Sequence, residues 1–341
     1  MTIGIKSVVF ALFGSLAVVA GNITAAQQSA NPSLNDPETC SDIWKPVQLP
    51  VSTNDLVEGE VIRNDDGDEI EPEKLINIIC RDHFITRYNS VTKTPDWVIE
   101  KLSRAITMGD HTRPKIGFGP DMVLPAGTIG AVDRDYRNSG LARGHQAASA
   151  DFKSNSEWMH QTFIFSNAVP QLQKGFNGGI WRALEDHTQD FAKALPDDEA
   201  IIVITGPVYM PPDGAEIVIA AAQNGCGNEI RLAGVNKLKK RSICDANDKD
   251  AGVVCKHGVA VPAGLYKIIF VPKSGRVIGF LFSNEDHGKS STRGTSDEEY
   301  FENWRASVNV IEEAANLDFF PGKSRRWRRV HEESCTATRW R

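Results

Sequence analysis

The sequence predicts an α+β protein, in which helices pack beside a central sheet, and two kinds of pattern support this fold class. Largely apolar, β-rich runs at 200–204, 261–271 and 277–282 predict buried strands. Between Ile180 and Leu195, apolar residues recur at steps of three and four, which predicts one amphipathic helix. Helix and strand patterns therefore occur together in the second half of the chain.

The first 26 residues have the pattern of a secretory signal peptide. Lys6 precedes an apolar run from Val8 to Ala20, and small residues close the segment near Ala26. The run is short for a membrane span, and no later stretch approaches the necessary length. We therefore expect cleavage near Ala26 and a soluble protein, without a membrane partner, that is secreted or periplasmic.

Six cysteines follow this segment, in agreement with export to an oxidising compartment. They are Cys40, Cys80, Cys226, Cys244, Cys255 and Cys335. Spacing alone does not choose among the pairings, but we expect Cys40 to pair with Cys80 and Cys244 with Cys255. Because no C-x-x-C pair is present, a zinc site is disfavoured.

The mature chain is expected to form one catalytic body with additions at both ends. A polar and acidic extension occupies 27–80, and its acidic part, 55–74, is interpreted as a solvated loop. The domain itself is placed at 81–322 with an insertion at 211–260. A basic tail follows at 323–341.

Within the domain, strands are predicted at 84–89 and 97–99, the second running into a helix through Leu102. The strand at 200–204 is expected to end in a turn at 205–209. Later, apolar residues from Phe301 to Ala315 recur at helical spacing and predict a closing helix.

Three polar residues in the middle of the chain are suited to metal-assisted attack on a phosphodiester. A neutral His145 can take a proton from water, and Asn177 offers an oxygen to Mg²⁺, an ion that keeps most of its waters. Glu185 can hold those waters from about 12 Å further along a helix, since each residue rises about 1.5 Å. Each also has an ordinary alternative: a structural histidine, a helix cap and a solvated glutamate.

The order of these residues resembles the DNA/RNA non-specific endonuclease family. The resemblance rests on Arg143-Gly144-His145-Gln146-Ala147, Ser166-Asn167-x-x-Pro170-Gln171, Asn177-x-x-x-Trp181 and Leu184-Glu185. It implies a ββα-metal (His-Me finger) nuclease core, with a central, mostly antiparallel sheet flanked by helices. The implied cofactor is one Mg²⁺, which Mn²⁺ could replace.

The resemblance also implies a role for each site residue. His145 is the general base, Asn177 binds the metal directly, and Glu185 binds it through water. Arg113 grips the phosphate, to which a guanidinium fork is well matched. Arg143 positions the nucleic-acid backbone or braces its own loop. The implied reaction is hydrolysis of DNA and RNA, independent of the sugar, to products with a 5′-phosphate.

One position departs from the family, which usually has Asp-Arg-Gly-His where this chain has Ala142. If the missing carboxylate orders metal waters or the neighbouring arginine, Asp133 or Asp135 could replace it. Asn167, by the same resemblance, is a structural connector and only a second choice of metal ligand.

A net charge of -6 argues against nucleic-acid binding by the whole surface, so affinity must come from a local groove around Arg113 and Arg143. The tail after Lys323 could add phosphate contacts or could be a disordered end tethered by Cys335. Two other functions stay open: a binding protein disabled by Ala142, and an exported nuclease toxin. DNA and RNA are the expected partners, while a homodimer and a protein inhibitor both stay open.

Overall fold

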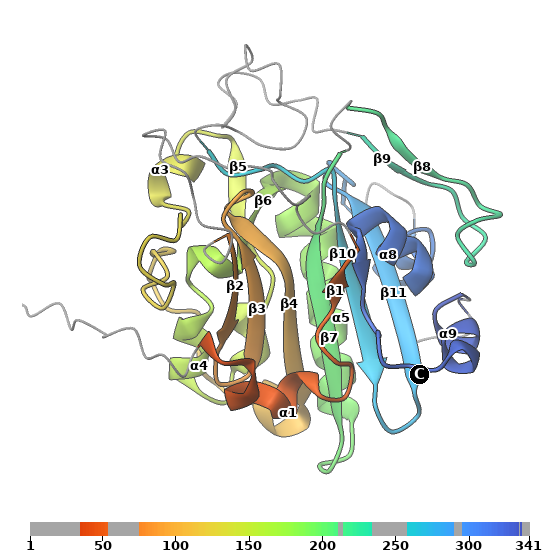
Figure 1. Ribbon diagram of the computed structural model, residues 1–341, viewed down its shortest axis with the longest axis horizontal. Coiled ribbons are helices and arrows are strands. Elements are labelled where there is room, and N and C mark those ends of the chain that lie inside the picture. The colour runs from red at the N-terminus through yellow and green to blue at the C-terminus, as the bar shows by residue number, and fades with distance from the viewer. Residues whose placement is uncertain are drawn as a thin grey trace, which may run out of the picture.

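A six-stranded antiparallel sheet runs through the molecule in the order β11-β10-β7-β4-β3-β2 (Figure 1). The strands are β2 (Ile76–Cys80), β3 (Phe84–Asn89), β4 (Thr94–Ser103), β7 (Ala200–Val208), β10 (Gly264–Val271) and β11 (Arg276–Ser283). This sheet and its covering helices confirm the α+β class. The computed structural model describes residues 35–53, 75–210, 214–233, 258–289, 295–333 and 335.

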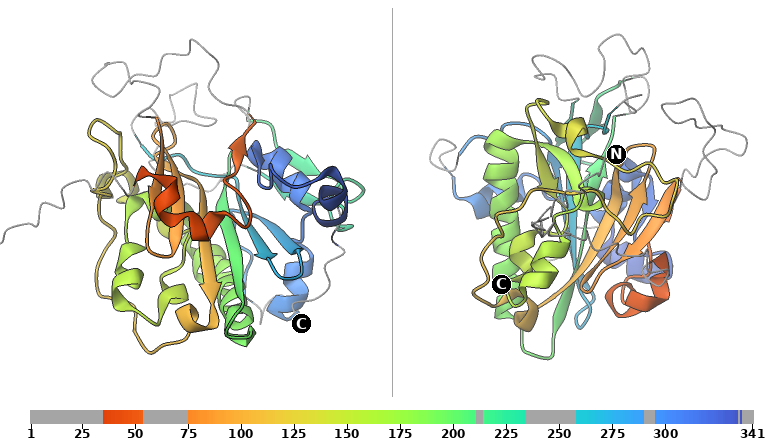
Figure 2. Two further views of the ribbon diagram at one scale, coloured as in Figure 1. Left: turned by 60° about the horizontal axis from the view of Figure 1, so that its bottom comes forward. Right: turned by 90° about the vertical axis from the view of Figure 1, so that its left-hand side faces the viewer.

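Side chains alternate across the strands, so the sheet has two buried faces. In β4, Trp97 and Ile99 join one apolar cluster, whereas Val98 and Leu102 join the other. We call these two sides the α8 face and the α5 face. In Figure 2, helices α5 and α8 lie on opposite sides of the sheet.

The α8 face is covered by short elements from both ends of the chain (Figure 1). They are α1 (Ser41–Trp44), β1 (Val51–Ser52), β8 (Ile217–Ile219), β9 (Ile230–Leu232), α8 (Val308–Ala315), β12 (Leu317–Asp318) and α9 (Arg325–His331). β1 pairs with β12, which joins the two ends of the chain on this face.

The α5 face is covered by α4 (Ser156–Gln161), α5 (Trp181–Ala194) and α7 (Asp297–Glu302). The predicted amphipathic helix corresponds to α5, which buries Trp181, Leu184 and Ala192. Before it, Gln173–Ile180 forms an irregular helical turn that is kinked at Gly175, where φ is 74°. Asn177 therefore lies in this irregular turn rather than in the first turn of a regular helix.

Strand pairing corrects two of the predicted boundaries. Leu102 belongs to β4, and the next helix, α2 (Arg104–Thr107), begins only after Ser103, whose hydroxyl accepts a hydrogen bond from the amide of Ile106. The turn expected at 205–209 is wrong as well, because β7 continues to Val208. Pairing with β4 stops at Thr205, so Pro207 occupies a stretch of β7 that is free along that edge.

The predicted closing helix is divided into α7 and α8. Between them the backbone turns toward β11, and the amides of Leu281 and Ala306 donate to the carbonyls of Trp304 and Gly279. Pairing with a strand has therefore replaced helical hydrogen bonds that the apolar spacing alone predicted.

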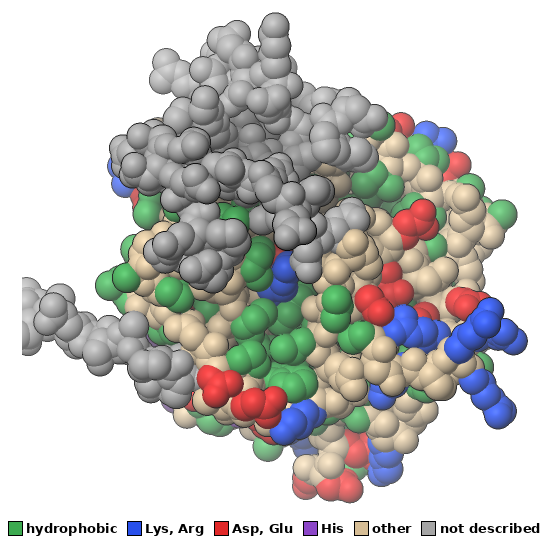
Figure 3. Space-filling model, in the orientation of Figure 1, with side chains coloured by type: hydrophobic (Ala, Val, Ile, Leu, Met, Phe, Trp, Pro, Cys, Tyr) green, Lys and Arg blue, Asp and Glu red, His purple; other side chains and the backbone are tan. Residues whose placement is uncertain are grey.

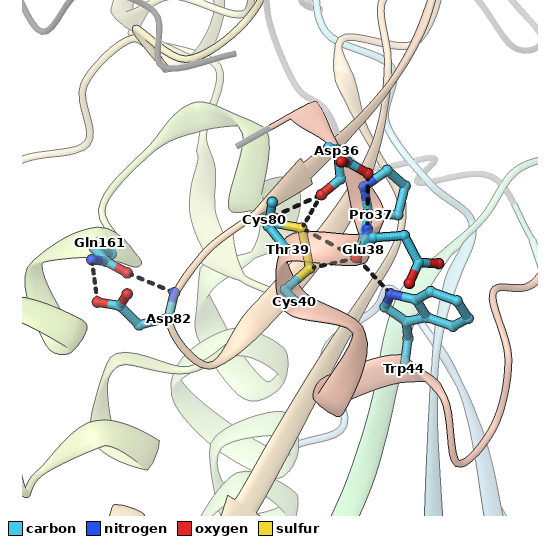
Figure 4. Close-up of a disulfide and its surroundings, with 9 residues drawn as sticks. All are labelled: Asp36, Pro37, Glu38, Thr39, Cys40, Trp44, Cys80, Asp82 and Gln161. Carbon is cyan, nitrogen blue, oxygen red and sulfur yellow. Dashed lines mark hydrogen bonds between the residues drawn. A yellow bond between two sulfur atoms is a disulfide. The ribbon is translucent and has the colours of Figure 1, made fainter. Parts of the chain in front are cut away.

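Two disulfides fasten the ends of the chain to the domain. Cys40–Cys80 joins the first helices to β2, as expected (Figure 4). The second, Cys226–Cys335, was not anticipated and ties Cys335, four residues beyond α9, to the loop between β8 and β9. All four cysteines in the described residues are paired.

The beginning of the basic tail is ordered as α9, whereas a disordered end had been the alternative. Its Trp327 packs against Phe320 and Phe270, with ring centroids 5.1 and 6.2 Å apart. The signal segment, the acidic loop at 55–74, and Cys244 with Cys255 lie outside the described residues. Among the described helices, none has the length and apolar character needed to cross a membrane.

Candidate active site

A hairpin and a helix build the site. β5 (Leu141–His145) pairs antiparallel with β6 (Ala168–Leu172), and the irregular turn then leads from β6 into α5. Neither strand was anticipated, because five residues that carry polar and small side chains lack a clear alternation. The resulting order, strand, strand and helix, is that of the expected ββα core.

A cleft of about 910 Å³ lies along this unit. Its lining includes all five residues singled out in the sequence: Arg113, Arg143, His145, Asn177 and Glu185. The hairpin and the loop before it thus bring residues that are far apart in the sequence to one cleft.

His145 ends β5 and is 8 % exposed. Its ring lies between Phe118 and Phe163, with centroids 4.5 and 4.8 Å away. Burial, together with the nearby charge of Arg113, lowers the pKa of His145 to about 3. The imidazole is therefore neutral near pH 7, with one ring nitrogen unprotonated.

The two ring nitrogens of His145 are not equivalent. Nε2 is buried and has no hydrogen-bond partner among the described residues. Because the residue lines the cleft, Nδ1 is the nitrogen left to act there. A neutral tautomer with its proton on Nε2 would present a lone pair on Nδ1.

Arg113 shares the ring of Phe163 with His145. Its guanidinium carbon is 4.9 Å from the centroid of that ring, and it forms no ion pair with an acidic residue in the described part of the chain. A cation–π contact orients the guanidinium without neutralising it. Arg113 can therefore offer its full charge to a phosphate.

Arg143, by contrast, is already paired. Its Nη2 contacts the carboxylate of Asp133, and its guanidinium carbon is 5.6 Å from the centroid of Tyr136. Asp133 also accepts from Arg137 at 2.7 Å. The pKa of Asp133 is lowered, first by the hydrogen bond from Arg137 and then by the charge of Arg143.

Two motif residues support the hairpin rather than the chemistry. Asn167 is fully buried; its Oδ1 accepts from the amide of Ala147 at 2.9 Å, and its Nδ2 donates to the carbonyls of Ala147 and Thr162, both at 3.0 Å. Gly144 faces the side chain of Gln171, which occupies the space that a Cβ would need.

Asn177 and Glu185 are the residues that could hold a divalent cation. Asn177 Nδ2 donates to Gln173 at 3.1 Å, while Oδ1 has no partner in the described residues. Burial raises the pKa of Glu185 to about 8, although the charge of Lys267 opposes this shift. A cation nearby would stabilise the ionised carboxylate.

Within the described residues, no group of three or more His, Cys, Asp and Glu side chains could hold a metal. One free amide oxygen and one carboxylate suit an ion such as Mg²⁺, which takes few protein ligands and retains water.

The model of the DNA/RNA non-specific endonuclease family matches residues 71–326. The chain belongs to this family. It is 30 % identical over 239 residues to the mitochondrial nuclease EXOG of Xenopus laevis, an alignment that covers 69 % of this chain and 55 % of the relative. Nuclease C1 of Cunninghamella echinulata is 25 % identical over 255 residues, with 73 % of this chain and 85 % of the relative covered.

A solved structure has the same fold. The EndoG/EndoGI complex contains a chain with a TM-score of 0.54 and 22 % identity, over 73 % of this chain and 88 % of that one. The present chain spans about half the length of the first curated relatives it matches, with 55 %, 42 % and 56 % of them covered.

In this member of the endonuclease family, Asp133 is the acidic residue beside Arg143. Of the two candidates to replace the family's carboxylate at Ala142, Asp135 is occupied elsewhere, since its Oδ2 accepts from the amide of Val132 at 2.9 Å. Asp133 lines the cleft together with Ala142 and Arg143.

Sequence reasoning missed a polar network beneath the family's site. Lys267 of β10 is 1 % exposed, and its Nζ donates to Thr205 of β7 at 2.8 Å. Glu100 of β4 is equally buried and lies beside Asp151, and burial raises the pKa of both carboxyl groups, that of Asp151 to about 6. A lysine and a glutamate inside otherwise apolar strands were the available signal.

Proposed function

We propose that the protein is a metal-dependent endonuclease that hydrolyses phosphodiester bonds in both DNA and RNA. The observation that supports this most directly is the cleft, where a neutral imidazole and an unpaired guanidinium accompany a free amide oxygen and a carboxyl group. These are the groups that an in-line attack of water on phosphorus requires: a base, a phosphate clamp and a site for a cation.

In the proposed mechanism, His145 Nδ1 removes a proton from the attacking water. Arg113 binds the phosphate through its planar fork and stabilises the charge that develops on the oxygens. Arg143, held by Asp133, positions the backbone of the substrate. Burial of His145 favours its neutral form, so the base stays available well below pH 7.

Asn177 would bind the metal directly and Glu185 through water. When bound, Mg²⁺, or Mn²⁺ in its place, supplies positive charge that stabilises the pentacovalent phosphorus and the leaving 3′ oxygen. Departure of that oxygen would leave a 5′-phosphate on the product. Because the named contacts are to phosphate, they favour neither a base sequence nor a sugar.

We also propose that the protein is exported. The signal-like segment at 1–26 supports export, as do the two disulfides in the described residues. Mass spectrometry of the protein purified from medium and from periplasm would locate it and define its first residue. An uncleaved N-terminus on a cytoplasmic protein would contradict the proposal.

The decisive experiment measures nicking of supercoiled plasmid and cleavage of single-stranded RNA by the oxidised protein, with Mg²⁺ or with EDTA. We expect both substrates to be cut only with Mg²⁺, and His145→Ala to abolish cutting while binding in EDTA is retained. His160→Ala is the matched control, because this exposed histidine lies on α4, outside the cleft lining.

Two results would overturn the proposal. Unchanged cutting by His145→Ala would remove the proposed base. Retained binding without any cutting by the natural protein would instead indicate a nucleic-acid-binding protein whose site is disabled at Ala142. Labelling of product ends tests the 5′-phosphate separately.

A protein that blocks the cleft is the further partner we propose. The similar solved structure is a complex of EndoG with EndoGI that concerns the inhibition of EndoG. Co-purification under native conditions, followed by release of activity on denaturing the partner, would test this. Full activity of the protein in a crude extract would argue against it.

A further inference from the structure

The outward surface of α9 carries several arginines. Three of them, Arg325, Arg326 and Arg329, are exposed and form no ion pair in the described part of the chain. At about 100° per residue they fall within an arc of roughly 100°. Figure 3 shows Lys and Arg side chains projecting at the edge of the molecule where Figure 1 places α9.

The opposite side of the helix fixes it in place. Trp327 packs on Phe320, and Arg328 donates to Asp318 at 3.1 Å and to the carbonyl of Phe320 at 2.8 Å. The disulfide of Cys335 lies four residues beyond the end of the helix. The three arginines are therefore presented on a rigid, anchored support.

Helix stability favours Arg329, which lies in the last turn, but it does not explain Arg325 and Arg326. The first turn of a helix favours acidic side chains, because its free amides carry positive charge. Yet Arg325 and Arg326 are the first two residues of α9, and no acidic residue occurs in its first turn. Their placement costs the helix free energy, which a bound polyanion would offset.

We propose that this arginine face is a second binding site for nucleic acid, separate from the cleft. Guanidinium groups match phosphate geometry, and three on one face can follow a phosphate backbone. The proposal rests on the proposed function for the identity of the polyanion, since a nuclease must hold long substrates. The arginine face lies at the end of the segment that matches the family model, because that match stops at residue 326.

The two sites lie on different sides of the sheet. Trp327 of α9 packs in the apolar cluster of the α8 face, whereas α5 and the cleft belong to the other cluster. Only a long, flexible nucleic-acid strand could occupy the cleft and the arginine face at once. A strand held at α9 would then raise the local concentration of scissile bonds near the cleft.

The test compares the natural protein with Arg325→Gln/Arg326→Gln/Arg329→Gln. Anisotropy in EDTA measures binding of oligothymidylate of about 60 nucleotides, several times the size of a typical single-strand site. We expect weaker binding and a slope of log K against log salt that is smaller by about 2, because each contact contributes about 0.7. The triple Arg→Lys variant, which keeps the charge, should retain most of the slope.

The matched control removes three exposed cations that already have acidic partners: Lys45, Arg104 and Arg231. Replacing these with Gln gives the same change in net charge and should leave binding nearly unchanged. Equal weakening by both triple variants would overturn the proposal, as would no weakening by the α9 variant. Loss of binding to phosphatidylglycerol vesicles but not to oligothymidylate would overturn it in favour of a lipid surface.

Cleavage separates this inference from the proposed function. The α9 variant should cut an oligonucleotide of about 8 nucleotides, within the size of one site, at the natural rate. If the natural protein binds through α9 but never cuts, the proposed function fails and the arginine site stands. If it cuts normally and the α9 variant binds long strands equally well, only the arginine site fails.

Discussion

Asp133 holds Arg143 in the cleft from ten positions earlier in the chain. The same carboxylate accepts two hydrogen bonds from Arg137, at 2.7 and 3.1 Å, so that one acid is shared by two arginines. Ala142 stands where the family usually has Asp, and Asp133 is the carboxylate that contacts the neighbouring Arg143. Its side-chain contacts are with the two arginines.

Replacing Asp133 with Asn should therefore weaken substrate binding more than the chemical step. Arg143 would lose its partner, and we expect KM to rise about 2- to 5-fold, the scale of an exposed ion pair, with kcat nearly unchanged. Steady-state cleavage of RNA gives both parameters. The control is Asp190→Asn, which changes an exposed carboxylate paired with Lys193 on α5. If the KM of Asp133→Asn equalled that of the natural protein, the prediction would be contradicted.

Gly144→Ala should destabilise the hairpin, because the new Cβ would overlap the amide of Gln171. A buried overlap of this kind typically costs about 1 to 3 kcal/mol. In Gly144→Ala/Gln171→Ala the second change makes room, so part of the loss should be recovered. Urea unfolding of both single variants and the double variant measures the coupling. Strictly additive losses would mean that the two side chains do not compete for space.

Lys267→Met should be among the most damaging single changes outside the cleft. It leaves Glu100 and Asp151 buried without their cation, and breaking a buried ionic arrangement costs about 3 to 5 kcal/mol. Adding Glu100→Gln removes one stranded carboxyl group, so the double variant should be more stable than the single one. The measurement is the free energy of unfolding in urea.

Lys273→Met provides the comparison for that series. Lys273 lies in the turn between β10 and β11, and its ion pair with Glu199 is largely exposed on the lysine side. Loss of such a surface pair usually changes stability by less than about 1 kcal/mol. If Lys267→Met lowered the free energy of unfolding as little as Lys273→Met, the carboxyl groups of Glu100 and Asp151 would not need the charge of Lys267.

Sequence patterns predicted those parts of the fold in which local periodicity agrees with tertiary packing. The helix at α5 was predicted from one helical period, and β10 and β11 were predicted from continuous apolar runs that the sheet buries on both faces. Leu102 and the segment around Trp304 were assigned wrongly, since hydrogen bonds to distant strands decided their conformation. No local pattern records such pairing.

Motif order singled out His145, Asn177 and Glu185 as candidate site residues, and the structure brings them to one cleft. Their roles stay predictions. The choice of Asp133 over Asp135 required the structure, because it depends on which carboxylate is already used by a backbone amide. Lys267 was missed because a polar residue in an apolar run was treated only as an interruption of the strand. The run itself does not show which distant polar groups it meets.

Glu185→Gln should stabilise the metal-free protein at high pH while it abolishes cleavage. The folded pKa of Glu185, about 8, is above its ordinary value of 4.5. Between these values the folded state holds a proton that the unfolded state has released. Stability from this group is therefore fully present below pH 4.5 and is lost as pH rises through 8. A neutral glutamine avoids that loss.

Urea unfolding in EDTA at about pH 4 and about pH 9 measures the difference. We expect the two proteins to be equally stable at the lower pH, and the variant to be more stable at the higher pH by on the order of 1 kcal/mol, after allowance for screening by water in the cleft. Adding Mg²⁺ at the higher pH should stabilise the natural protein more, because only its carboxylate can retain the ion's waters. Glu313→Gln, on the exposed side of α8, should show neither effect. Equal stability of the natural protein and the Glu185→Gln variant at both pH values would mean that the Glu185 carboxyl group is hydrated as freely as in the unfolded chain.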